Sequence, residues 1–207
     1  MCKIIYKEGK GTGFFCEINN FPIKYALFTN NNILNENNIE KGNIINIEYY
    51  EDLKYKNKKL EINENRRVYT NKELDYTCIE INKLDNINNY FKIDPIIYKN
   101  KKNSIINSDI FILQYLKGNN ELSLSYSKIL SLKDNYIIYN GSIEEELSGS
   151  PIIRRSKDNY IIGLHNDAIE KDKNIYLYNL GTIFDSILND IDKQINLSQN
   201  KLNEILS

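Results

Sequence analysis

The apolar residues of this chain come in short runs, and this feature constrains its fold more than any other. Most runs are rich in Ile and Tyr, and they end at clusters of Asn, Asp, Gly or Lys. β-branched and aromatic residues between such turn-forming residues predict strands. Many short strands at close spacing predict an all-β barrel or sandwich. We expect strands at residues 3–6, 13–18, 23–29, 44–50, 60–63, 67–70, 76–81, 109–116, 121–125, 135–139, 150–153, 160–164 and 174–178.

The C-terminal segment follows a different period. From Thr182 onward, apolar residues recur three or four positions apart with acidic residues and Lys between them, which predicts an amphipathic helix. We expect its apolar side to pack on the body, and binding of a partner is the alternative use of that side. Residues 196–198 are a candidate interruption before a last turn. The apolar positions are Ile183, Phe184, Ile187, Leu188, Ile191 and Ile195.

The charge of the chain is balanced, with 27 Lys and Arg residues against 28 Asp and Glu residues and a formal net charge of -1. Such a chain carries no long-range field that attracts nucleic acid or an anionic membrane, so we expect neither as a partner. Lysine clusters at residues 54–59 and 99–102 are broken by Asn and Tyr, and we interpret them as solvated hairpin loops.

Three cysteines, Cys2, Cys16 and Cys78, make an odd number without the spacing of a disulfide framework or a metal site. The N-terminus lacks the apolar run of a signal peptide, and no stretch approaches the length of a membrane span. We therefore expect a cytoplasmic protein whose reduced cysteines fill apolar space, without a metal or another cofactor.

The segment Leu147-Ser148-Gly149-Ser150-Pro151 is the strongest candidate for chemistry. Nucleophilic acyl transfer needs a serine on a tight turn, a base within hydrogen-bond reach, and an acid that orients the base. It also needs backbone donors aimed at the oxyanion that develops. Because a Ser-Gly-Ser-Pro string alone is more often an ordinary loop, its interpretation depends on the other segments of the chain.

Several segments, taken in order along the chain, resemble those of the trypsin-like serine peptidases. The resemblance covers nearly the whole chain, and the histidine, aspartate and serine positions follow in the family's order. Order and spacing together are more specific than any single motif. The chain is thus similar to a cytosolic, disulfide-free member of this family. The matching segments are residues 11–16 (opening strand), 26–34 (histidine segment), 75–81 (aspartate strand), 112–118 and 122–126 (hairpin), 147–151 (serine loop), 161–165 and 179–182.

This resemblance implies a chymotrypsin fold, which is all-β and consists of two six-stranded antiparallel β-barrels followed by a C-terminal α-helix. The N-terminal barrel would span residues 1–97, the C-terminal barrel residues 98–181 and the helix residues 182–207. The cleft between the barrels would bind a peptide or protein ligand. By the same resemblance, the cleft would be lined by Ser142, Leu164 and His165.

The resemblance also assigns catalytic positions, one of which departs from the family. Ser148 matches the nucleophile and Asp75 the orienting acid, whereas Asn32 stands where the family has its histidine base. A carboxamide has no nitrogen that titrates near neutral pH, so it cannot accept the serine proton and return it to the leaving group. Losing the base of such a triad typically costs several orders of magnitude in rate.

A second departure concerns the oxyanion hole, which the resemblance assigns to the backbone at Glu146 and Ser148. The family usually has glycine at the position of Glu146. Glycine tolerates backbone angles that glutamate disfavours. The carboxylates of residues 144–146 would also oppose a developing negative charge.

Three hypotheses for the function follow. The leading one is a pseudoprotease, a serine-protease homologue with lost or severely impaired hydrolysis and a cleft that binds a peptide. The first alternative is an active endopeptidase that uses Ser148 with a rearranged base, either a lysine or His165, the single histidine of the chain. We favour His165 as a residue of the cleft wall, because active relatives carry histidine there beside the usual base. The second alternative is a structural or regulatory interaction module.

Overall fold

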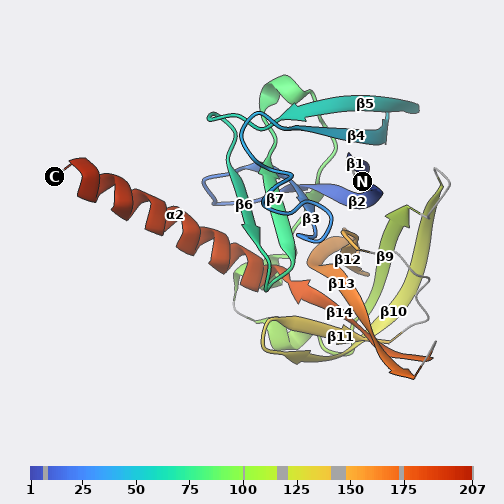
Figure 1. Ribbon diagram of the computed structural model, residues 1–207. Coiled ribbons are helices and arrows are strands. Elements are labelled where there is room, and N and C mark those ends of the chain that lie inside the picture. The colour runs from blue at the N-terminus through green and yellow to red at the C-terminus, as the bar shows by residue number, and fades with distance from the viewer. Residues whose placement is uncertain (7–8, 100, 116–120, 141–147, 173–174, 207) are drawn as a thin grey trace.

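The computed structural model describes residues 1–6, 9–99, 101–115, 121–140, 148–172 and 175–206 (Figure 1). The strands form two groups, one in each half of the chain, and a long C-terminal helix follows the second group.

The first group is an eight-stranded sheet with the order β5-β4-β1-β2-β3-β7-β6, to which β8 adds by pairing with β2. The pairs along this path are antiparallel, and β8 runs parallel to β2. A short 3-10 helix, η1 (Lys83–Asp85), precedes β8. The strands are β1 (Cys2–Tyr6), β2 (Gly9–Glu17), β3 (Tyr25–Thr29), β4 (Ile44–Glu51), β5 (Lys54–Glu61), β6 (Val68–Asn71), β7 (Tyr76–Glu80) and β8 (Phe91–Lys92).

The second group is a closed antiparallel barrel with the order β10-β11-β14-β13-β12-β9. Two short helices, α1 (Pro95–Tyr98) and η2 (Lys102–Ile105), connect the two groups, and α2 (Phe184–Leu206) directly follows β14. The strands of the barrel are β9 (Asp109–Tyr115), β10 (Leu122–Lys133), β11 (Tyr136–Tyr139), β12 (Pro151–Arg154), β13 (Tyr160–Asp172) and β14 (Ile175–Ile183).

The structure confirms a mostly β chain with a six-stranded barrel and a C-terminal helix. A second closed barrel is not confirmed, because β5 and β6 end the path of the first sheet in the described part of the chain. The interpretation of residues 54–59 as a loop is wrong, since they belong to β5, which pairs along its length with β4. Lysine is common on edge strands because its charge blocks unwanted pairing.

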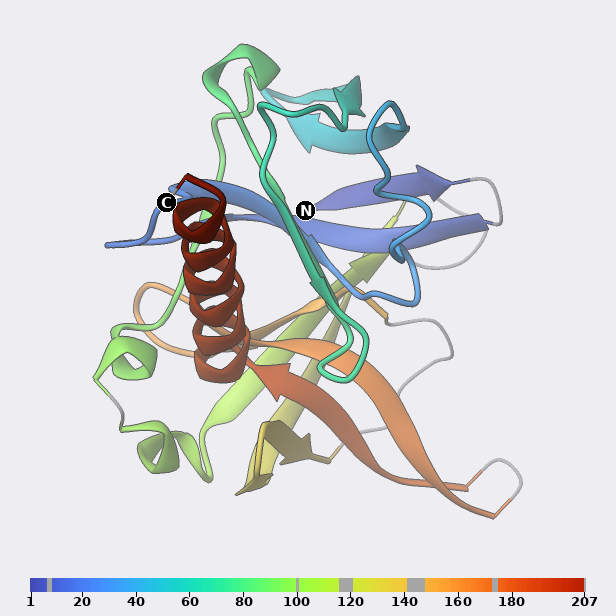
Figure 2. The same cartoon turned by 60° about the vertical axis from the view of Figure 1, so that its left-hand side comes forward.

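One hydrophobic core joins the two halves. Phe14 and Phe28 of the first sheet pack against Phe184 at the start of α2, with ring centroids 6.1 and 5.0 Å from that of Phe184. The same cluster continues into the barrel through Ile112 and Ile152. The first turns of α2 therefore lie against both halves, whereas its C-terminal end projects from the body (Figures 1 and 2).

Candidate functional site

Asp75 lies in the turn between β6 and β7, and its backbone is in the left-handed region with φ of 46°. The Oδ1 atom of Asn71 accepts the backbone N–H groups of Glu73 and Leu74, at 2.9 and 3.0 Å. An asparagine side chain that caps its own turn in this way is typical of tight turns. The β6–β7 turn lies at the end of the first sheet that faces the barrel (Figure 1).

Asn32 lies in the loop after β3 and meets Asp75 through its backbone, whereas its side chain is exposed. The backbone nitrogen of Asn32 donates to Asp75 Oδ1 at 3.0 Å. In the described part of the chain, the side-chain amide of Asn32 makes no hydrogen bond. The structure thus brings the predicted base and acid positions together, with an N–H group and not an imidazole against the carboxylate.

Asn30, which the sequence analysis missed, connects the acid turn to the serine loop. Its side chain is fully buried. The Nδ2 atom donates to the carbonyl oxygen of Asp75 at 2.7 Å, and Oδ1 accepts the backbone N–H of Gly149. Both ends of one amide are therefore satisfied by two segments that are far apart in the sequence.

Asn166 on β13 is a second connection that the sequence analysis missed. Its Nδ2 atom donates to Asp75 Oδ2 at 3.4 Å, and its Oδ1 atom accepts the backbone N–H of Thr182 at 2.6 Å. The hydroxyl of Ser148 donates to the backbone carbonyl of Asn166 at 3.3 Å. Asn166 thus stands between the predicted nucleophile and the predicted acid.

The residue after Ser148 must be glycine for two reasons. Gly149 has a φ of 85°, where side chains are disfavoured. A Cβ atom at this position would also lie 1.9 Å from the carbonyl oxygen of Thr12, which already accepts the Thr29 hydroxyl at 2.7 Å. The serine loop therefore packs directly on the backbone of the first sheet.

Burial dominates the electrostatics of Asp75. Loss of solvent raises the pKa of its carboxyl above the ordinary value, although the N–H donors from Asn32 and Asn166 act in the opposite direction. The nearby Asp167 carboxylate adds to the increase. Because burial outweighs these donors and no cation neutralises the carboxylate among the described residues, the protonated form gains relative to an exposed Asp.

The other residues predicted for the site fall into two sets. Leu164 is fully buried in the shared core, and His165 is 2% exposed. His165 Nδ1 shares a hydrogen bond with the hydroxyl of Tyr139, and burial lowers the pKa of His165 to about 3. Ser142 and Glu146, as well as Leu147, lie outside the described residues.

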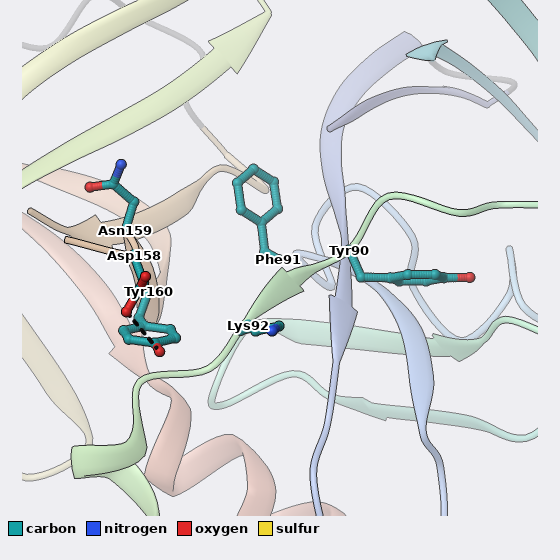
Figure 3. Close-up of a pocket in the computed structure, with 6 residues that line it drawn as sticks. All are labelled: Tyr90, Phe91, Lys92, Asp158, Asn159 and Tyr160. Carbon is teal, nitrogen blue, oxygen red and sulfur yellow. Dashed lines mark hydrogen bonds between the residues drawn. The ribbon is translucent and has the colours of Figure 1, made fainter. Parts of the chain in front are cut away.

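A separate hollow of about 340 Å³ lies between the segment around β8 and the turn that joins β12 to β13 (Figure 3). The ring of Tyr90 points away from it and stacks on Tyr25, with centroids 4.3 Å apart. The Tyr160 hydroxyl donates to Asp158 at 3.2 Å, so two of the polar groups satisfy each other. The other polar side chains that line the hollow are those of Lys92 and Asn159.

No cluster of three or more His, Cys, Asp or Glu side chains that could hold a metal ion occurs within the described ranges. None of the helices in that part of the chain combines the length and the apolar character that a membrane span requires.

Comparison with solved structures decides the fold. The chain is similar to the serine protease of a human pathogenic astrovirus, with 17% sequence identity and a TM-score of 0.55 over 88% of this chain and 87% of that one. It is also similar to the MamO protease domain of Magnetospirillum magneticum, with 9% identity and a TM-score of 0.58 over 91% and 94%. The structure of Deg5 gives 13% identity and a TM-score of 0.60 over 91% and 85%.

The chain has a chymotrypsin-like fold, with one closed barrel and one sheet among the described residues. No family model matches its sequence, and no curated protein matches it either. In this chymotrypsin-fold chain the site around Ser148 lies where the barrel meets the first sheet, because Asn30 and Asp75 come from the sheet and Asn166 from the barrel.

Proposed function

We propose that this chain is a pseudoprotease, a serine-protease homologue that has lost efficient hydrolysis and retains a cleft for a peptide or protein ligand. One observation carries the proposal: the Asp75 carboxylate is met by the N–H of Asn32 and the amide of Asn166, where a working triad needs an imidazole. Neither group titrates near neutral pH, so neither can accept the serine proton, and Ser148 lacks a general base in this arrangement.

The buried state of His165 disfavours the alternative of an active endopeptidase. A base must be neutral, within reach of the serine hydroxyl and able to gain a proton. His165 is neutral, but its Nδ1 atom is engaged with Tyr139, and its low pKa opposes the gain of a proton. The hydroxyl of Ser148 instead donates to the carbonyl of Asn166.

The proposed loss of the oxyanion hole stands on the sequence. Glu146 replaces the family's glycine within a run of three glutamates. Negative side chains near the oxyanion would raise the energy of the transition state that the family stabilises there. Loss of the base and loss of this glycine would each lower the rate independently.

Strand β13 supports the proposed binding of an extended peptide. Up to Leu164 this strand pairs with β12 on one side and β14 on the other. From Asp167 to Asp172 it pairs only with β14 among the described residues, and this part directly follows Asn166, whose carbonyl oxygen accepts the Ser148 hydroxyl. Such an edge can accept a peptide as an additional strand, with backbone hydrogen bonds for affinity and side-chain pockets for specificity.

A fluorophosphonate probe tests the loss of hydrolysis, because it modifies a serine only when that serine is activated. We expect negligible labelling of the full chain and of the Ser148→Ala control. Labelling and peptide cleavage should appear in the double variant Asn32→His with Glu146→Gly. Rapid stoichiometric labelling of Ser148 in the unmodified chain would overturn the proposal, and its loss in His165→Ala would then support the rearranged base.

Binding is tested with fluorescent peptides selected from a displayed random library on the full chain. We expect micromolar binding that Ser148→Ala leaves unchanged, because the hydroxyl is not needed for strand addition. Two results together would favour an interaction module whose cleft is unused. One is that no selected peptide binds the chain saturably, and the other is that cellular partners still associate after charge reversal of residues 144–146.

A further inference from the structure

Side chains of α2 form hydrogen bonds with the chain on both sides of the turn that carries Asp75. After the turn, the hydroxyl of Tyr76 donates to Asp190 Oδ2 on α2 at 2.6 Å. Before the turn, the carbonyl oxygen of Thr70 accepts from Gln194 Nε2 at 3.2 Å. Two side chains of the helix therefore bracket the segment in which Asp75 lies.

The two α2 residues that make these contacts, Asp190 and Gln194, also form a hydrogen bond with each other. Asp190 and Gln194 are four residues apart, so they lie on the same face of α2. Gln194 Nε2 donates to Asp190 Oδ2 at 2.8 Å and lies 3.2 Å from the Tyr76 hydroxyl. Tyr76 is fully buried, and burial together with the Asp190 carboxylate raises the pKa of its hydroxyl well above the ordinary value. The hydroxyl therefore stays protonated and remains a donor.

The contacts around Asp75 offset the cost of its backbone conformation. Its φ of 46° is in the left-handed region, which aspartate tolerates better than most residues with a side chain but which still costs energy. The carbonyl oxygen of the preceding residue, Leu74, accepts the hydroxyl of Thr182 at 2.8 Å. Thr182 lies two residues before α2, so the C-terminal segment holds the chain immediately before Asp75 as well as after it.

We propose that Asp190 and Gln194 are positioning residues of the Ser148 site, which hold the β6–β7 turn so that the Asp75 carboxylate meets the N–H of Asn32. The proposal rests on the proposed function only in taking Asp75 as the acid position of the site. It makes α2 a part of the site's framework, although none of its described side chains forms a hydrogen bond with Ser148.

Amide hydrogen exchange, followed by NMR on the full chain, tests this role. The reporter is the backbone N–H of Asn32, which Asp75 accepts, and the reference is the N–H of Leu27 in the paired part of β3. In Tyr76→Phe and in Asp190→Ala we expect Asn32 to exchange about tenfold faster relative to Leu27, the effect of weakening one hydrogen bond. Asp192→Ala, which removes an exposed carboxylate from the same helix, should leave the ratio unchanged.

Two results would overturn the proposal. One is an unchanged exchange rate of the Asn32 N–H in Tyr76→Phe. This variant loses a single oxygen and keeps its ring in the core, so it remains informative if Asp190→Ala does not fold. The other is an equal acceleration at Asn32 and Leu27, which would mean general loosening. Because exchange reports neither hydrolysis nor peptide binding, failure here leaves the proposed function standing, and failure of the labelling test leaves this proposal standing.

Discussion

Gly149 and Gly42 share a left-handed backbone but differ in what surrounds them. Gly42 has a φ of 94°, and a Cβ added there would have no atom within 4 Å, whereas a Cβ added at Gly149 would lie 1.9 Å from the carbonyl oxygen of Thr12. Gly42→Ala should therefore cost only the conformational strain, about 1 kcal/mol. Gly149→Ala should cost roughly 3 kcal/mol or more, because overpacking adds to the strain. Urea unfolding of both variants measures the difference, and equal losses would contradict the packing of the serine loop on the first sheet.

His165 makes the stability of the chain depend on pH. Burial lowers its pKa to about 3, so the folded state binds fewer protons than the unfolded state, whose histidine titrates near the ordinary 6.5. Stability from this group is complete above pH 6.5 and falls as the pH drops from 6.5 toward 3. The free energy of unfolding should decrease by about 2 kcal/mol between pH 7.5 and pH 5. Urea unfolding at both values checks this, and His165→Gln should remove most of the difference; the same dependence in that variant would exclude His165 as its source.

The motif residues of the site could be predicted from the sequence, but the residues that connect them could not. The sequence singles out Asn32 and Asp75 as positions of one candidate site, and in the structure the backbone N–H of Asn32 donates to Asp75. Asn30 and Asn166 gave no signal, because this chain is rich in asparagine and their partners lie far away in the sequence. Only the fold brings a buried amide into contact with both loops, so local pattern cannot distinguish it from an exposed Asn.

At the scale of elements, the β4–β5 hairpin turns through two residues with positive φ, Asp52 at 53° and Leu53 at 62°. Such turns favour Asn and Gly, and leucine is strained there. Leu53 is 86% exposed, so it gains little from packing. Leu53→Gly should therefore raise the free energy of unfolding by about 1 kcal/mol. Thermal unfolding measures the gain; Leu53→Ala is the control that removes the exposed side chain and keeps the strain, and an equal gain in both variants would point to exposure as the cause.

The elements that the sequence analysis placed incorrectly are those in which tertiary contacts override local composition. β5 contains the lysines expected in a loop, yet its pairing with β4 holds it as a strand, and Lys56 forms an ion pair of 2.7 Å with the buried Glu51. Residues 196–198 continue α2 without a break, and the Ser198 hydroxyl donates to the carbonyl oxygen of Gln194 one turn earlier.

At the scale of the whole molecule, contacts between the two halves are both apolar and polar. The segment after β8 places Asp94, which is 2% exposed, against the Arg154 guanidinium of β12 at 2.6 Å. Asp94 also accepts the N–H of Ile96 at the start of α1. Such a buried carboxylate is tolerated because each of its oxygens has a donor. The strand pattern predicted the fold class. The core that the two halves share could be recognised only from the three-dimensional arrangement, because its residues lie far apart in the sequence.

This shared core predicts that the two halves unfold together. Phe184 on α2 contacts Phe14 and Phe28 of the first sheet from its place at the end of the barrel, so Phe184→Ala opens a cavity that both halves border. We expect a loss of about 3–5 kcal/mol in the free energy of unfolding. When urea unfolding is followed through amide signals, the midpoints measured for β4 and for β11 should fall by the same amount and stay equal to each other. Leu197→Ala, at a 62% exposed position of the same helix, should change stability by less than about 0.5 kcal/mol. A lower midpoint in only one half would mean that the sheet and the barrel unfold independently.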